Sequence, residues 1–476
     1  MKIKIGQKFA VVLVLGVFWF NTGSVALART LSNLRSGIYG DKARLVMNYD
    51  TLPRYKVTVN GKQLVMEFNA EVEQKEKLRP KGTLIQTAAL EPYEKKSRLI
   101  VNFSQPVPQY KVFTLKNPKR LVIDFTGPAA PIPAAKPQAS WGAPVKLGEG
   151  LTYKETRVNM GAGNSSVYTL EIAPQSAFTL KPVPGYGGLI QKGVLSQIAK
   201  RSGAKAVVNA CYFDAEIWVV GNLLIDGKWL GMERDPHTVL AMSRDKVSIY
   251  PNVAYVGRVV REDGQAFDIT GLNRYRLAND LIYFNDGYDN TTDTNGYGWE
   301  VRVENGRASE ISGKGSMPLR AGSFVLSGNG TAATFLQAIK LGSAVNVMQG
   351  LDNPDANAAT SVAGAGPLLV MDGKMQVLAD QEDIASDIAE GRSPRTAVGV
   401  RADGSVLVVV VDGRSSSSVG MTLNELAAYF VRLKAERAMN FDGGGSSEMV
   451  VNGRIVNAPS DGSERPVRVA LGIFPK

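Results

Sequence analysis

An acidic residue, three consecutive glycines and two serines make residues 442–447 the stretch of this sequence whose composition best suits chemistry. The stretch follows one short apolar run and precedes another, so it is predicted to be a loop between two strands. Glycines let a backbone approach a ligand closely, and successive N–H groups can form an anion-binding nest suited to phosphate or sugar hydroxyls. The residues of this predicted nest are Gly443, Gly444, Gly445, Ser446 and Ser447. A tight turn without a ligand is the alternative, because Asn452-Gly453 shows that the chain also uses glycine in hairpins.

A second aspartate, Asp412, also stands between an apolar run and a glycine, in "SVLVVVVDG". Between the two aspartates, residues 421–438 are predicted to form a helix that begins with a capping box of Thr422 and Glu425. A strand, helix, strand order favours a sheet with at least one parallel crossover, whose functional loops lie beyond the carboxyl ends of the strands. If the two strands are neighbours, Asp412 and Asp442 converge on one edge of that sheet.

Composition excludes several other classes of site. The glycine loop lacks the Gly-Lys-Ser/Thr ending of a P-loop, and "GAGPLL" carries Pro367 where a dinucleotide-binding loop would continue into a helix. The single histidine, His237, excludes any site that needs several imidazoles, and the single cysteine, Cys211, cannot form an internal disulfide. We therefore expect neither a metal centre nor a cofactor.

Calcium is the exception that the sequence leaves open. Residues 352–357, "DNPDAN", and residues 284–296, "FNDGYDNTTDTNG", are rich in the oxygen ligands that calcium prefers. Neither has the spacing of an EF-hand, so a solvated loop is the alternative for each. The second stretch is equally compatible with a lid over the site.

The first 28 residues have the pattern of a secretory signal. Lys2, Lys4 and Lys8 precede an apolar run at 9–20, and Ala26-Leu27-Ala28 supplies a small-x-small cleavage site. The mature protein is therefore expected to begin near Arg29 and to be extracytoplasmic: periplasmic, in the cell wall or secreted. An uncleaved signal anchor is the alternative.

Residues 29–126 are predicted to form a β-sandwich module with an internal repeat. The repeated segments are "KARLVMNY" (42–49) and "KSRLIVNF" (96–103), "YKV" (55–57 and 110–112), and "LVMEF" (64–68) and "LVIDF" (121–125). Two similar small sheets packed face to face are the expected product. The second copy, "SRLIVNFSQPVPQYKVFTLKNPKRLVIDF" (97–125), resembles the AMIN domain, a family of β-sandwich modules that attach envelope proteins to the cell wall.

Basic residues are concentrated in this module. The chain has a net charge of +11, and residues 29–126 hold 18 Lys and Arg against 9 Asp and Glu. For an exported protein this excess favours an anionic partner such as a cell-wall polymer, and not a nucleic acid. A basic face that serves only solubility is the alternative.

Beyond the module, residues 127–143 are rich in Pro and Ala and are predicted to be a semi-rigid linker. Residues 144–476 are predicted to form one large domain, with a long sheet and insertions. The expected fold class is α+β: an N-terminal β-sandwich module, a linker and a larger domain with a mixed α/β sheet.

Several blocks of the second domain follow one another in a recognisable order. They are "VVNACYF" (207–213), "GAGPLLVMDGK" (364–374), "SPRTAVGVRADGSVLVVVVDGR" (393–414), and "NFDGGGSSEMVVNGRIVN" (440–457) followed by "ERPVRVALGIF". They resemble the phosphodiester glycosidase family, which is the family of N-acetylglucosamine-1-phosphodiester α-N-acetylglucosaminidase, over roughly residues 150–476. The chain departs from the family at Asn209-Ala210-Cys211, where Asn-Gly-Gly is usual, and the two extra side chains are expected to narrow or reshape the site. Cys211 is expected to be a buried small residue and not a reactive thiol.

The resemblance implies a hydrolase that cleaves the bond between a sugar's anomeric carbon and a phosphate oxygen. The leaving phosphate needs a cation, for which Arg395 is the candidate, with a structural ion pair as the alternative. An oxocarbenium-like transition state needs a carboxylate as nucleophile or as base for water, and Asp442 is assigned this role. Asp412 is expected to be its partner acid/base or to orient Arg395.

The remaining predicted substrate contacts also follow from the resemblance. They are Asn209 with a sugar hydroxyl or acetamide, Ser446 and Ser447 with phosphate oxygens, and Arg465 as a second anion contact. For each, a purely structural role is the alternative. The expected substrate is a phosphate-linked glycan of the cell envelope, and the alternative function is a non-catalytic envelope protein that binds such polymers.

Overall fold

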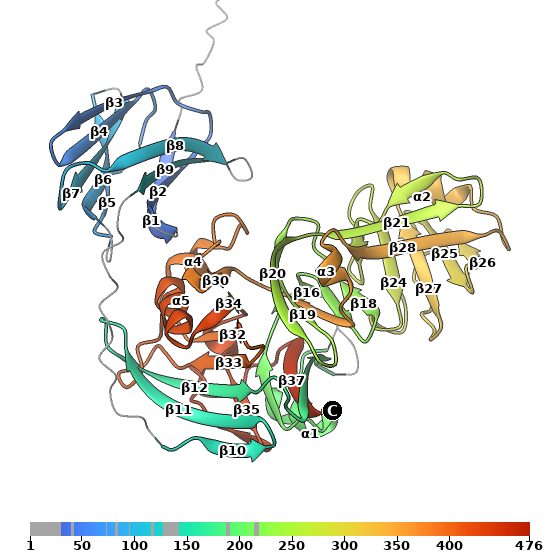
Figure 1. The fold of residues 1–476 in the computed structure, drawn as a ribbon. Helices are drawn as coiled ribbons and strands as arrows, with labels where there is room; N and C mark the ends of the chain where they lie inside the picture. Colours follow the sequence, from blue (N-terminus) through green and yellow to red (C-terminus); the bar gives the residue numbers. More distant parts are fainter. Residues whose placement is uncertain are drawn as a thin grey trace, which may run out of the picture.

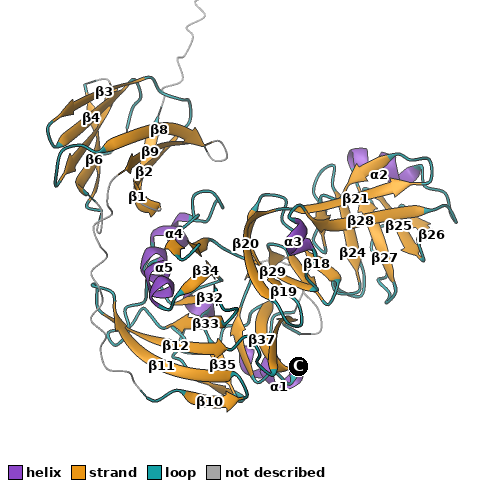
Figure 2. Ribbon diagram, in the orientation of Figure 1, coloured by secondary structure: helices purple, strands orange, loops and turns teal. Residues whose placement is uncertain are grey.

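Figure 1 shows the chain in a computed structural model, which describes residues 30–39, 42–72, 74–80, 84–94, 96–115, 119–126, 142–186, 191–213 and 219–476. The predicted signal segment and nearly all of the predicted linker lie outside these residues. Strands dominate the described part, and its five α-helices span at most ten residues each (Figure 2). None of these helices is long and apolar enough to cross a membrane. The predicted α+β class therefore holds only coarsely, because the protein is far richer in strand than that class implies.

The amino-terminal module consists of two antiparallel sheets packed on one another. The first has the order β1 (Leu31–Tyr39), β2 (Lys42–Tyr49), β9 (Arg120–Thr126), β8 (Gln109–Leu115). The second has the order β3 (Tyr55–Asn60), β4 (Gln63–Phe68), β7 (Lys96–Phe103), β6 (Ile85–Tyr93), β5 (Glu76–Leu78). Alternating apolar residues from both sheets, among them Met47, Met66 and Phe125, form a common buried core.

Each copy of the sequence repeat contributes strands to both sheets. Strand β2 of the first copy pairs with β9 of the second, and β4 of the first copy pairs with β7 of the second. Two face-to-face sheets are thus present, but neither is built from one copy alone, as the repeat by itself suggested. The exchange buries the apolar face of each copy against the other, so the two copies share one core.

Three arginines of the module face the second domain. The pairs are Arg35–Glu390 at 3.6 Å, Arg44–Asp380 at 4.0 Å and Arg120–Asp383 at 3.9 Å. In Figure 1, strand β1 correspondingly lies beside helix α4 (Ser386–Glu390). Part of the basic excess of the module is therefore directed at acidic residues of the same chain.

The second domain is organised around an eight-stranded sheet. Its order is β10 (Val145–Gly148), β11 (Leu151–Asn159), β12 (Asn164–Ile172), β33 (Val406–Val411), β32 (Arg395–Arg401), β34 (Ala435–Asn440), β30 (Leu368–Met371), β31 (Lys374–Met375). Helix α5 (Leu423–Arg432) connects β33 to β34, begins at the predicted capping box of Thr422 and Glu425, and packs on one face of the sheet. The predicted helix is thus confirmed at its start, but it ends at Arg432 and not at residue 438, because Ala435–Asn440 form β34.

The expected parallel crossover is present, because α5 connects β33 to β34 and these two strands run in the same direction. They are not neighbours, however, and every pairing in this sheet is antiparallel. Strand β32 lies between β33 and β34 and pairs with both. Two strands that flank the same antiparallel neighbour must run in the same direction. The carboxyl ends of β33 and β34 therefore share one edge of the sheet with the first residue of β32, which is Arg395.

Two further sheets cover the other face of the eight-stranded sheet. One has the order β13 (Phe178–Pro184), β37 (Val469–Pro475), β14 (Ala206–Asn209), β35 (Met449–Val451), β36 (Arg454–Ile455). The other has the order β18 (Lys228–Gly231), β17 (Leu223–Ile225), β29 (Ser361–Gly364), β19 (His237–Met242), β20 (Val247–Val253). One core joins all three sheets, with Val408, Val208 and Leu240 among its fully buried members. Helix α1 (Leu195–Ser202) packs against β14, and β15 (Tyr212–Phe213) pairs with β16 (Val219–Val220).

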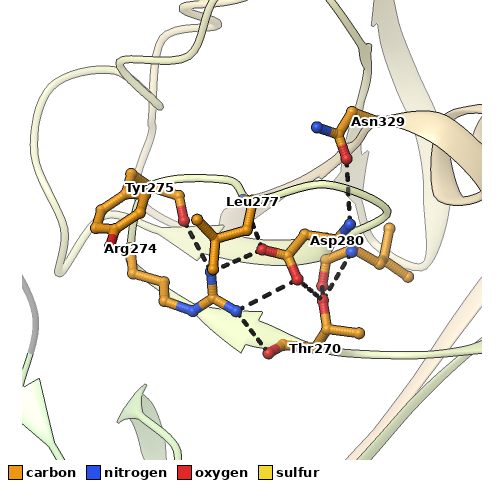
Figure 3. A network of polar contacts seen from close by, with 7 residues as sticks. Thr270, Arg274, Tyr275, Leu277, Asp280 and Asn329 are labelled. Atoms are coloured by element: carbon orange, nitrogen blue, oxygen red, sulfur yellow. Dashed lines mark hydrogen bonds and ion pairs between the residues drawn. The ribbon is translucent and has the colours of Figure 1, made fainter. Parts of the chain in front are cut away.

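An insertion between β20 and β29 projects from the rest of the domain (Figure 1), and its core is continuous with residues of the sheet that contains β19, such as Val239 and Ala241. Its first sheet has the order β22 (Ala266–Asp268), β21 (Tyr255–Arg261), β28 (Val345–Leu351). Its second sheet has the order β23 (Gly271–Leu272), β24 (Leu281–Asn285), β27 (Ser323–Gly328), β25 (Trp299–Glu304), β26 (Arg307–Ser312). The insertion also contains helices α2 (Gly330–Gln337) and α3 (Pro354–Asn357). Figure 3 shows the polar network that fixes the β23–β24 connection: Arg274 donates to the Asp280 carboxylate at 2.8 Å and to the Thr270 carbonyl at 2.8 Å.

Candidate active site

The glycine loop links the eight-stranded sheet to the sheet that contains β35. Three features of the structure require glycine there. A Cβ on Gly443 would lie 3.0 Å from the Pro394 carbonyl oxygen, and Gly444 has a φ of +61°. A Cβ on Gly445 would overlap the Arg465 guanidinium. The glycines thus allow close packing of backbone and cationic side chains, in a short 3-10 turn, η1 (Gly444–Ser446).

The predicted nest of free N–H groups is only partly present. The Gly443 N–H donates to Asp442 Oδ1 at 2.8 Å, and the Gly444 N–H donates to the Pro394 carbonyl at 2.9 Å. Two of the three glycine amides therefore have acceptors within the protein. Negative charge on a ligand at this loop would be met mainly by side chains.

Asp442 is the titratable group at the start of the loop. Its residue is partly exposed, and its backbone N–H donates to the Ala210 carbonyl at 2.9 Å. Burial of the carboxyl raises its pKa to about 6, against the opposing influence of the Ser446 hydroxyl, the Gly443 N–H and the Arg465 guanidinium. A carboxyl that titrates near 6 can change its protonation state close to neutral pH, as catalysis requires.

Asn209 ends strand β14 directly beneath this loop. Its Nδ2 donates to the Asp442 carbonyl at 2.6 Å, and its Oδ1 accepts from Thr396 Oγ1 at 2.6 Å and from the Glu448 N–H at 3.3 Å. The residue is fully buried. The structure therefore places its amide in bonds within the protein, where it ties the two sheets together under the loop.

Arg395 also lies at this edge but points away from the loop. Its side chain is 1% exposed and donates to the carbonyls of Met421, Ile388 and Gly391. Burial lowers its pKa to about 10, so it stays a cation at neutral pH. Its Cδ lies 3.8 Å from where a Cβ on Gly443 would stand. These contacts hold the segment after α4, and the proposed phosphate contact of Arg395 stays a prediction.

Asp412 has its carboxylate enclosed by donors. Tyr168 donates to Oδ2 at 3.0 Å, Asn457 donates to Oδ1 at 2.9 Å, and the Ala458 N–H lies 3.2 Å from both oxygens. Burial raises its pKa, which these hydrogen bonds partly offset. Asn457 also donates to the Ser447 carbonyl at 3.1 Å, so Asp412 supports the end of the glycine loop from behind.

Two guanidinium groups lie over the glycine loop. Arg465, predicted as an anion contact, packs on Gly445, pairs with Asp461 at 2.6 Å and keeps 41% of its side chain exposed. Arg414 is exposed, and its Nη2 lies 3.1 Å from where a Cβ on Gly444 would stand. Sequence reasoning missed Arg414, although it ends the quoted block "VVVVDGR", two residues after Asp412.

The two loop serines are buried, with 2% of Ser446 and 1% of Ser447 exposed. Neither hydroxyl has a hydrogen-bond partner of normal geometry within the described residues. Such groups are available to a ligand or a proton, as the prediction of polar contacts at these two positions requires.

The two residues that replace the family's glycines are both buried in the core between the sheets. Ala210 is fully buried, and Cys211 is 2% exposed with its pKa raised by burial to about 12. Cys211 is thus the buried small residue that was expected, and not a reactive thiol. The departure changes the packing beneath Asp442, and neither side chain lines an exposed surface.

The possible calcium ligands serve local structure in the described chain. Asn353 caps α3 by accepting the Ala356 N–H at 3.0 Å, and Asn357 accepts the Leu351 N–H at 2.9 Å. In the second stretch, Asn285 donates to the Trp229 carbonyl at 2.7 Å. Across the residues that the structure describes, no cluster of three or more His, Cys, Asp or Glu has the geometry to hold a metal ion.

The comparison with known proteins agrees with both resemblances. Residues 285–474 match the phosphodiester glycosidase family, and residues 81–147 match the AMIN domain. The carboxyl-terminal part of the chain, which contains the glycine loop, therefore carries a match to the phosphodiester glycosidase family. The family match begins at the end of β24, inside the insertion.

Individual relatives match over short segments. The SPbeta prophage-derived uncharacterized protein YomE of Bacillus subtilis is 42% identical over 82 residues, which is 17% of this chain and 13% of that protein. N-acetylglucosamine-1-phosphodiester alpha-N-acetylglucosaminidase of Bos taurus is 39% identical over 69 residues, 14% of this chain and 13% of that protein. The matched segments thus span about an eighth of the length of these relatives. The crystal structure of a hypothetical protein from Synechocystis is similar in fold, with a TM-score of 0.63 and 21% identity over 94% of this chain and 81% of that one.

Proposed function

We propose that this protein is an exported hydrolase that cleaves the bond between a sugar's anomeric carbon and phosphate in glycosyl-1-phosphodiesters of cell-envelope glycans. One observation carries the proposal: Asp442, partly exposed and with a raised pKa, lies beside a glycine loop on which the guanidinium groups of Arg414 and Arg465 rest. A carboxyl for the sugar carbon and cations for the phosphate are the two groups that the reaction needs.

The proposed role of each residue follows from its position. Arg414 and Arg465 hold the phosphate anion, and the buried hydroxyls of Ser446 and Ser447 complete its contacts. Asp442 acts as a carboxylate on the anomeric carbon or on the attacking water. Asn209, Asp412 and Arg395 are positioning residues in this scheme. Asn209 bonds to the Asp442 carbonyl, Asp412 holds Asn457, which donates to the Ser447 carbonyl, and Arg395 donates to carbonyls of the neighbouring α4 region.

A hydrolysis screen tests this proposal. The full mature chain is incubated with a panel of glycosyl-1-phosphodiesters that includes N-acetylglucosamine-1-phosphodiesters, and release of free sugar is measured. Turnover of at least one member is the expected result. Binding of phosphate-linked polymers without turnover of any member would instead make the protein a non-catalytic envelope binder.

The acidic limb of the pH–rate profile is expected near pH 6. Asp442 must be ionised to act, so kcat/KM should fall about tenfold per pH unit below its pKa of about 6. The contribution of Asp442 to the free energy of unfolding has the opposite pH dependence. The folded protein binds the proton more tightly than the unfolded chain does, so this stabilising contribution is fully present below pH 3.8 and is lost as the pH rises through about 6. An acidic limb near pH 4 would contradict the assignment of Asp442.

Removal of either loop guanidinium is expected to weaken substrate binding. Arg414→Ala and Arg465→Ala should each raise KM about tenfold, since a charge-assisted contact with phosphate contributes roughly 1.5 kcal/mol or more. The rise should shrink at high salt, where exposed charges are screened. Arg454→Ala, which removes an exposed arginine of β36, is the matched control. An unchanged KM in both loop variants would remove these residues from the site.

We further propose that the protein acts outside the cytoplasm and that its amino-terminal module binds an anionic wall polymer. The AMIN match and the basic excess of residues 29–126 support this. Cell fractionation, with amino-terminal sequencing of the mature protein, is expected to find the chain outside the cytoplasm and beginning near Arg29.

A further inference from the structure

Glu448, directly after the glycine loop, is a buried carboxyl without a donor. It is 1% exposed, and neither of its carboxylate oxygens has a hydrogen-bond partner of normal geometry among the described residues. The adjacent hydroxyls of Ser446 and Ser447 are in the same condition. Buried polar atoms nearly always have partners, so four such atoms in three consecutive residues indicate a place built for a ligand or a proton.

Glu464 is the charged group that faces Glu448. It accepts hydrogen bonds from the Ser196 N–H at 2.8 Å and the Ser196 hydroxyl at 2.6 Å, in the first turn of α1. Burial acts to raise the pKa of Glu464, but the hydrogen bonds from Ser196 and Glu448 prevail and lower it. Glu464 therefore stays ionised.

An ionised Glu464 keeps Glu448 neutral. Burial, together with the adjacent Glu464 carboxylate, raises the pKa of Glu448 to about 9. The nearby cation, Arg465, pairs with Asp461 and does not neutralise the two glutamates. A proton on Glu448 turns it into a donor to Glu464, which gives the buried Glu448 carboxyl a hydrogen-bond partner.

The acid pair lies at the end of the loop opposite Asp442. The side chains of Asp461 and Arg465 lie against Gly445, so Glu464 and the loop guanidinium come from one segment. Asp442 and Glu448 thus stand at the two ends of the same turn, and at neutral pH Asp442 is mainly ionised while Glu448 is protonated. Two carboxyls whose environments drive their pKa values apart are the usual basis for separate base and acid roles.

Resting on the proposed function, we propose that Glu448 supplies the proton that the leaving phosphate takes up. The bond between the anomeric carbon and the bridging oxygen breaks with its electron pair on that oxygen, which receives the proton. Water supplies a hydroxyl to the anomeric carbon, and its remaining proton passes to Asp442. Exchange with solvent then returns both carboxyls to their starting states.

The test is a pair of near-isosteric variants whose pH–rate profiles differ. Glu448→Gln should lower kcat on the order of 10²-fold and abolish the decline that the wild type shows above about pH 9. Glu464→Gln should keep most of kcat at the optimum pH. It should move the alkaline decline to lower pH, because removal of the neighbouring negative charge lowers the pKa of Glu448. Glu262→Gln, at an exposed position, is the matched control.

The outcomes separate this inference from the proposed function. A wild type that hydrolyses a glycosyl-1-phosphodiester, with Glu448→Gln unchanged in rate and alkaline decline, would overturn the role of Glu448 and leave the proposed function standing. A readout without substrate is the infrared carbonyl band of a protonated carboxyl at pH 8. If the band is present in the wild type and lost in Glu448→Gln, Glu448 carries a proton, even if no substrate is turned over. If the band is absent from the wild type, the proposed proton on Glu448 is overturned.

Discussion

Asp442→Asn is expected to lower kcat on a glycosyl-1-phosphodiester by a factor on the order of 10²–10⁴, the usual contribution of a carboxylate that acts in the transition state. The amide is nearly the same size and can still accept the Gly443 N–H, but it cannot attack carbon or take a proton from water. Because the loop guanidinium groups are untouched, KM should change little. The measurement is the initial rate over a range of substrate concentrations.

The stability of this variant distinguishes lost chemistry from lost structure. At pH 7 the wild type holds an ionised carboxyl whose burial is unfavourable, as its raised pKa shows. Asparagine carries no charge, so the free energy of unfolding of the variant should rise relative to the wild type at pH 7, and rise less at pH 4. Asp355→Asn, at an exposed position of α3, is the matched control. An inactive variant that is also destabilised would show only that Asp442 is structural.

Arg395→Ala is expected to destabilise the protein by about 3–5 kcal/mol. The substitution deletes a buried guanidinium and removes one hydrogen bond from each of the carbonyls of Met421, Ile388 and Gly391, of which, among the described residues, only the Met421 carbonyl keeps another donor, the Ser393 N–H. Chemical denaturation at pH 7 measures the change. Activity should be lost as well, since the segment after α4 and the Pro394 carbonyl that holds Gly444 depend on the same residue.

This result would separate two roles of Arg395. If the guanidinium mainly bound phosphate, the alanine variant would fold with normal stability and show only a raised KM. Arg244→Ala, which truncates an exposed arginine, is the control and should change the free energy of unfolding by less than about 0.5 kcal/mol.

Local patterns were sufficient for several elements and for the family. The capping box at Thr422 and Glu425 predicted the start of α5, because a cap is a contact between residues three apart in the sequence. The amino-terminal repeat predicted strands for the same reason, since alternation of apolar residues is local. The blocks around the glycine loop identified the phosphodiester glycosidase family, which the comparisons confirm for residues 285–474.

Pairing between distant segments could not be predicted in this way. The sequence left open whether the strands ending at Asp412 and Asp442 are neighbours, and the structure places β32 between them. Which strand occupies that place depends on which apolar faces match across the whole sheet. The same limit applies to the repeat, whose two copies exchange strands between sheets.

By itself the sequence determined the chemical types present: an aspartate before a run of glycines, serines after it, and arginines nearby in the chain. Only the tertiary structure decided which of these side chains stay available. Arg395 and Asn209 have their polar groups enclosed by bonds within the protein, while Arg414 and Arg465 remain exposed over the loop. The physical reason is that burial and hydrogen-bond partners come from residues remote in the chain, and these partners decide whether a polar group holds the fold or meets a substrate.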